Sequence, residues 1–137
     1  MTDPELVAKR LAIIETSVRD LRELADLPAV ESDIREARFV EHTLQIAIQA
    51  ALDTASHIVS DDRLGEPRTN RELFDLLARA GWIPPALAGV LQDMAGFRNV
   101  LVHGYDTVDL SIVRDVAENH LDDLLAFVKT VRGRLSA

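Results

Sequence analysis

Apolar side chains recur every three or four positions through almost the whole chain, which is the spacing of one face of an α-helix. No window shows a convincing pair of alternating strands. The apolar run at residues 100–102 is short enough to be a strand, but the sequence offers no second strand to pair with it. The pattern therefore predicts an all-α chain.

Capping residues and helix breakers divide this pattern into separate helices. Thr69 and Glu72 form a capping-box pattern, in which each residue bonds to the first turn of a helix. Gly81 and Gly104 are expected to end helices, and Gly104 to adopt the left-handed conformation. The predicted helices cover residues 4–28, beginning with Pro4 after Asp3 and stopping at Pro28; residues 32–60, capped by Ser32 or Asp33; residues 69–80; residues 84–103, opened by Pro84 and Pro85; and a last helix, capped by Asp106 or Asp109, that runs to about residue 135.

Four to five helices in 137 residues favour a helical bundle, a single domain over residues 1–137. The helix over residues 32–60 is apolar around much of its circumference, so we expect it to be central. Trp82 and Ile83 are expected to pack the corner between two helices. Hydrophobic residues make up 47% of the chain, which predicts a packed core rather than disorder.

Composition narrows the chemistry that the chain can perform. Without cysteine it has no disulfide framework, thiolate metal site or Cys nucleophile. It also lacks the paired Glu-x-x-His motifs of bundle metal sites, a glycine-rich phosphate loop and a serine elbow motif. We therefore expect neither a metal nor a cofactor. With no signal segment at the start and no apolar stretch that could span a membrane, a cytoplasmic location is expected.

The formal net charge of −8 counts against a general nucleic-acid binder, because such proteins attract phosphates through excess positive charge. Any action on RNA must then rely on a local basic cleft or on a basic partner. The helix over residues 32–60 carries a polar strip with few long charged side chains, formed by His42, Gln45, Gln49, Asp53 and Ser56. This strip could line a cleft or a dimer interface, or could be a mildly polar solvent face. His57 lies off the strip and is expected to be packed or half-exposed, and His120 to lie at the surface.

The segment over residues 98–105 concentrates the candidate catalytic groups. Arg98 carries a permanent charge suited to phosphate oxygens, and His103 can exchange protons near neutral pH. On an ideal helix these two side chains point about 140° apart, so either the helix unwinds before Gly104 or a second subunit completes the site. A simpler interpretation pairs Arg98 with Asp93 or Asp106 and leaves His103 to cap the helix end.

The segment Arg98-Asn99-Val100-Leu101-Val102-His103-Gly104-Tyr105, with Phe97 before it and Asp109 after it, resembles the Arg-x4-His-x-Tyr signature of HEPN-domain ribonuclease toxins of the HepT type. The similarity extends over residues 41–58 and from residue 73 to residue 109. The resemblance implies an all-α HEPN fold, a homodimer and metal-independent cleavage of RNA. DNA should not be cut because it lacks the 2′-OH.

The resemblance also assigns residues. It implies that Arg98 and His103 are catalytic, that Asn99 supports them, and that Tyr105 accepts AMP from a minimal nucleotidyltransferase antitoxin. His42, Gln45, Gln49 and Asp53 are then possible cleft residues. The rival hypothesis is a non-catalytic subunit that binds nucleotide or completes the nucleotidyltransferase, and the acidic charge favours it somewhat.

Overall fold

The computed structural model describes residues 2–104 and 108–136. Within these ranges it contains six α-helices, one short 3-10 helix and no strand. The helices are α1 (Pro4–Leu24), η1 (Leu27–Ala29), α2 (Ile34–Asp61), α3 (Asn70–Arg79), α4 (Pro85–His103), α5 (Leu110–Asn119) and α6 (Leu121–Ser136). The predicted all-α fold class is confirmed. In the described ranges, no helix combines the length and the apolar character that crossing a membrane would need.

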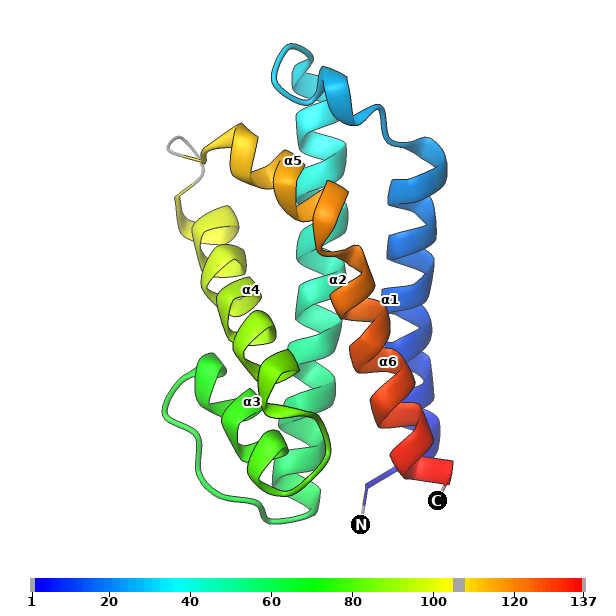
Figure 1. Ribbon diagram of the computed structural model, residues 1–137, viewed down its shortest axis with the longest axis vertical. Coiled ribbons are helices and arrows are strands. Elements are labelled where there is room, and N and C mark those ends of the chain that lie inside the picture. Colours follow the sequence, from blue (N-terminus) through cyan, green and yellow to red (C-terminus); the bar gives the residue numbers. More distant parts are fainter. Residues whose placement is uncertain (1, 105–107, 137) are drawn as a thin grey trace.

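α2 is the central element, as its apolar circumference predicts. It contacts α1, α3, α4, α5 and α6, and fourteen of its 28 residues are buried. Figure 1 shows α1 and α4 on either side of α2, with α6 running beside α1. α5 crosses the end of the bundle that lies away from the two termini (Figure 1). One hydrophobic core, to which all six helices contribute, therefore holds α4 against α2.

Side-chain caps fix the beginnings of the first three helices, because each satisfies amide groups that have no partner within the helix. The Asp3 carboxylate accepts hydrogen bonds from the backbone N–H groups of Glu5 and Leu6 at 3.0 and 3.3 Å. Asp33, rather than Ser32, caps α2. For α3, Thr69 Oγ1 accepts from the Glu72 N–H at 3.3 Å, while Glu72 Oε2 accepts from the Arg68 N–H at 2.6 Å.

The corner between α3 and α4 is a Schellman motif built on Gly81. The N–H of Gly81 donates to the Ala78 carbonyl at 3.1 Å, and the N–H of Trp82 donates to the Leu77 carbonyl at 2.9 Å. Gly81 has a φ of +80°, the left-handed region that glycine adopts without steric cost. Trp82 and Ile83 are buried, as expected. The Arg134 guanidinium lies 4.9 Å from the Trp82 ring centre and ties α6 to this corner.

Three local predictions are wrong. α1 ends at Leu24 rather than at Pro28, which instead lies within the 3-10 helix that begins at Leu27, where its ring fixes φ. The last predicted helix is two helices, because the chain turns at His120, whose φ and ψ of −121° and 6° are not helical. Gly104 is not left-handed, since its φ is −108° and its N–H still donates to the Val100 carbonyl at 2.8 Å.

Candidate active site

α4 delivers the arginine and the histidine of the motif from one unbroken helix. It begins after Pro84, with Pro85 in its first turn, and ends at His103. The hydrogen bond from Gly104 to Val100 shows that the last turn keeps the α-helical pattern. The helix therefore does not unwind before Gly104, and the alternative in which unwinding swings His103 toward Arg98 is excluded. Residues 100–102 are helical as well, so the strand alternative is excluded with it.

Arg98 points to the packed side of α4. It lies three or four positions from the buried residues Met94 and Leu101, which places its side chain within about 40–60° of theirs around the helix. Its Nε atom is buried and has no hydrogen-bond partner among the described residues. Its Nη1 atom lies 3.4 Å from the Asn99 Oδ1, so Asn99 contacts the guanidinium.

The charge of Arg98 is not neutralised by any carboxylate that the structure describes. Asp93, one of the two acidic partners considered from the sequence, lies 3.9 Å from Arg71 instead. Asp106, the other, is outside the described residues. An arginine that is half-buried without a counterion is available to an anionic ligand.

His103 lies on the opposite, exposed side of the last turn of α4. Its side chain points about 140° away from that of Arg98 around the helix. Tyr105, the expected AMP acceptor, is outside the described residues. Asp109 caps α5. Its carboxylate accepts hydrogen bonds from the hydroxyl and the backbone N–H of Ser111, and these bonds, the hydroxyl's first, hold the pKa of the Asp109 carboxyl below its ordinary value.

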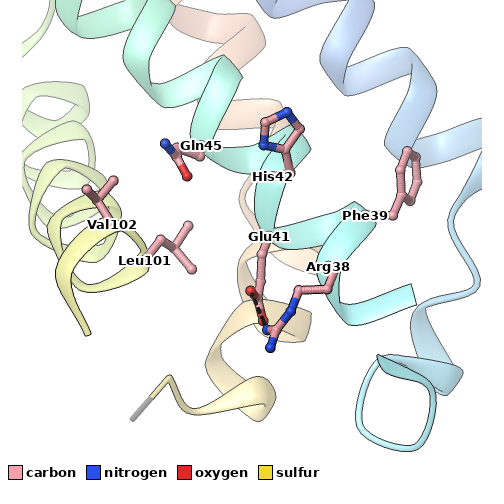
Figure 2. A pocket seen from close by; sticks show the side chains of 7 residues that line it. All are labelled: Arg38, Phe39, Glu41, His42, Gln45, Leu101 and Val102. Atoms are coloured by element: carbon pink, nitrogen blue, oxygen red, sulfur yellow. Dashed lines mark hydrogen bonds and ion pairs between the residues drawn. The ribbon is translucent and has the colours of Figure 1, made fainter. Parts of the chain in front are cut away.

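A pocket of about 590 Å³ lies between α2 and the end of α4, lined by Arg38, Phe39, Glu41, His42, Gln45, Leu101 and Val102. Gln45 and Leu101 project into the space between the two helices, whereas Phe39 projects from α2 toward α1 (Figure 2). Arg98 precedes Leu101 and Val102 by one helical turn on α4 but is not among the residues that line this pocket. The pocket brings together two of the predicted cleft residues, His42 and Gln45, with the end of α4.

The sequence did not single out Arg38 and Glu41, which form an ion pair in this pocket. Arg38 Nη1 lies 3.2 Å from Glu41 Oε2, and Glu41 is 7% exposed (Figure 2). A glutamate within a mostly apolar helix, with an arginine three positions before it, is the signal that could have predicted the pair. The pair gives one wall of the pocket a polar, charged surface.

The polar strip on α2 continues past this pocket into a second hollow of about 290 Å³. Gln45 lines both hollows, and Gln49 and Asp53 line the second together with Arg10 and Ile13 of α1. Gln49 Nε2 donates to Asp53 Oδ1 at 2.8 Å. The four residues His42, Gln45, Gln49 and Asp53 therefore line two hollows that share Gln45.

The other two histidines have structural contacts. His57 Nε2 accepts from the Asp3 N–H at 3.1 Å and lies 3.2 Å from Asp61, so it ties the start of α1 to the end of α2. His120, expected at the surface, is 40% exposed at its side chain and contacts Asp115 and Asp123 at the α5–α6 turn. Among the residues that the structure describes, no group of His, Asp and Glu side chains could hold a metal ion.

Comparison with known proteins places this arrangement in a family. A family described as "Ribonuclease HepT-like" matches residues 14–131. The chain is 30% identical over 129 residues to the "mRNA nuclease HepT" of Shewanella oneidensis, covering 93% of this chain and 97% of that protein. It is 31% identical over 109 residues to the "tRNA nuclease HepT" of Aphanizomenon flos-aquae, covering 78% and 74%.

The fold is shared with a solved relative. The structure of a tri-AMPylated Shewanella oneidensis HEPN toxin in complex with an MNT antitoxin superimposes with a TM-score of 0.87 at 30% sequence identity, covering 97% of this chain and 99% of that one. These matches confirm the resemblance that the Arg-x4-His-x-Tyr motif indicates. The chain therefore belongs to the family of HepT-like ribonucleases, the HEPN toxins of toxin–antitoxin pairs.

Proposed function

We propose that this protein is a metal-independent endoribonuclease toxin in which Arg98 and His103 act on RNA. The observation that carries the proposal is the state of Arg98, whose Nε is buried without a described hydrogen-bond partner and whose charge no described carboxylate neutralises. An uncompensated guanidinium suits a phosphate group. The relatives named mRNA nuclease and tRNA nuclease support RNA as the substrate class.

The two residues supply what cleavage of a phosphodiester needs without a metal. His103 takes the proton from a 2′-OH or gives a proton to the leaving oxygen, and Arg98 stabilises the negative charge that develops on the phosphate. The 2′-oxygen forms a bond to phosphorus as the bond to the leaving oxygen breaks. Asn99 supports this role through its contact with the Arg98 guanidinium.

We further propose that the active form is a homodimer. Because α4 continues to His103, the two catalytic side chains of one chain point about 140° apart, and a two-fold partner would bring a histidine to each arginine. The exposed isoleucines Ile13 and Ile46, 44% and 39% exposed beside the polar strip of α2, support this surface as an interface. The two hollows along His42, Gln45, Gln49 and Asp53 would then lie at or beside the cleft.

Control of the toxin is proposed to come from AMP transfer to Tyr105 by a nucleotidyltransferase antitoxin. The relative solved in complex with its MNT antitoxin is AMPylated, which supports the modification as a mechanism in this family. Tyr105 follows His103 by two positions, so AMP on its phenol would bring a negative charge near the site and compete with RNA for Arg98.

Cleavage of RNA in EDTA by the purified protein tests the activity and its metal independence together. His103→Ala and Arg98→Ala should each abolish cleavage and growth arrest, since neither the proton transfer nor the charge stabilisation has a substitute among the described residues. His120→Ala is the matched control, because it removes a histidine at the α5–α6 turn and should leave cleavage intact. Full activity of His103→Ala with an unchanged helical spectrum would refute the assignment.

The net charge of −8 favours a second candidate, a non-catalytic subunit that binds nucleotide for its nucleotidyltransferase partner. This function predicts a stable complex with the partner and no cleavage of RNA by the free protein. Mass spectrometry after co-expression adds the readout for Tyr105, whose mass should rise by one or more AMP units if it is the acceptor.

A further inference from the structure

The exposed side of α4 forms a narrow stripe that ends at His103. Gly96 and His103 are seven positions apart, so they point within about 20° of each other around the helix and lie about 10 Å apart along it. Asn99 and Val100 lie between them on the same side, and both are exposed. A strand of RNA cut at His103 would therefore follow this stripe when it extends along α4.

Arg71 of α3 reaches across to the beginning of this stripe. Its Nη1 atom donates to the Gln92 carbonyl at 3.1 Å, and the Gln92 side-chain amide donates back to the Arg71 carbonyl at 3.0 Å. The same Nη1 lies 3.4 Å from the position that a Cβ at Gly96 would occupy. The guanidinium therefore lies against α4 at Gly96, on the side of the helix that carries His103.

The charge of Arg71 is weakly compensated. Its ion pair with Asp93 spans 3.9 Å between side chains that are 54% and 84% exposed, and such surface pairs are weak and exchange readily. Asp93 is also the only acidic residue of α4, so the stripe from Gly96 to His103 carries no carboxylate. In a chain with a net charge of −8, this is a path along which a phosphate backbone meets little repulsion.

The stability of α3 does not explain why an arginine stands at position 71. Arg71 lies in the first turn of α3, where the helix dipole disfavours a cation. The partial positive charge of the helix N-terminus and the guanidinium act in the same direction on an anion bound at Arg71.

We propose that Arg71 is a phosphate-binding residue that holds the RNA strand on the exposed stripe of α4, away from the phosphate that is cut. The inference depends on the proposed ribonuclease function of His103. Arg71 therefore contributes to the binding of RNA and not to its chemistry.

Binding of a fluorescent single-stranded RNA, measured over a range of salt concentrations, tests the inference. His103→Ala serves as the background, so that the RNA stays intact. Arg71→Gln should weaken binding severalfold and lower the slope of log K against log salt by about 0.7, the value for one lost phosphate contact on a single strand. Arg71→Lys should keep the slope, because a lysine retains the charge.

Arg79→Gln is the matched control, because it makes the same change on an exposed arginine at the other end of α3. It should leave both the affinity and the slope unchanged. In the protein with His103 intact, Arg71→Gln should raise KM for RNA and leave kcat unchanged. Thermal unfolding of each variant establishes that the helical fold is retained.

The outcomes separate this inference from the function on which it depends. If Arg71→Gln has the same affinity and salt slope as Arg79→Gln while the wild-type protein cuts RNA, Arg71 has no role in binding and the proposed function stands. If the wild-type protein neither binds nor cuts RNA, the proposed function fails and the inference fails with it.

Discussion

Arg98 combines two properties that a residue kept for stability does not show. Its Nε is buried and, within residues 2–104 and 108–136, makes no hydrogen bond, and its charge has no carboxylate partner there. Leaving a buried donor unsatisfied costs about 1–3 kcal/mol of folding free energy. At the neighbouring buried positions of α4, Met94 and Leu101, apolar side chains meet no such cost. The physical cost of Arg98 is consistent with a group that is satisfied only when an anion binds.

Replacing Arg98 with methionine should therefore separate stability from activity. We expect Arg98→Met to raise the free energy of unfolding by about 1 kcal/mol, because an apolar chain of similar length removes the unsatisfied donor. Cleavage of RNA should be lost in the same variant. Urea unfolding followed by circular dichroism measures the first effect. Arg79→Met changes an exposed arginine, so its free energy of unfolding should stay within about 0.5 kcal/mol of the wild-type value. A lower free energy of unfolding for Arg98→Met than for the wild-type protein would contradict this account.

At the scale of the helices, the predictions that succeed are those that depend on neighbouring residues alone. The Asp3 cap, the Thr69 cap and the stop at Gly81 each involve groups within five positions in the chain. The turn at His120 also has local partners, but nothing in the apolar spacing distinguishes it from a continuous helix. The pocket between α2 and the end of α4 could not be predicted, because it depends on how closely α4 packs against α2.

The two glycines Gly81 and Gly89 should respond to alanine in opposite directions. Gly81 has a φ of +80°, so Gly81→Ala should cost about 1–2 kcal/mol through backbone strain. Gly89 lies inside α4 with nothing within 4 Å of an added Cβ, so Gly89→Ala should stabilise by about 0.5–1 kcal/mol. Thermal or urea unfolding of both variants measures the difference. Equal effects at the two positions would show that the Schellman corner does not limit the stability of the bundle.

At the scale of the whole molecule, one chain holds Arg98 and His103 without bringing their side chains together. The bundle fixes α4 against α2, so Arg98 stays on the packed side of α4 and His103 stays exposed at the end of the helix. The motif in the sequence predicts which residues act, and the resemblance implies a dimer. The direction of each side chain follows from the continuous helix, and under the proposed function a second copy would bring Arg98 and His103 together.

Mixing two inactive variants should restore cleavage if the site is shared between chains. Arg98→Ala lacks the arginine and His103→Ala lacks the histidine, but a mixed dimer keeps one site in which an intact Arg98 meets the partner's intact histidine. With random exchange of subunits, half of the dimers are mixed and each has one working site of two, so about a quarter of the activity should return. Mixing either variant with the double variant, which carries both alanines, should restore none. Size-exclusion chromatography with light scattering measures whether dimers form, and mixed dimers without activity would show that each site is built within one chain.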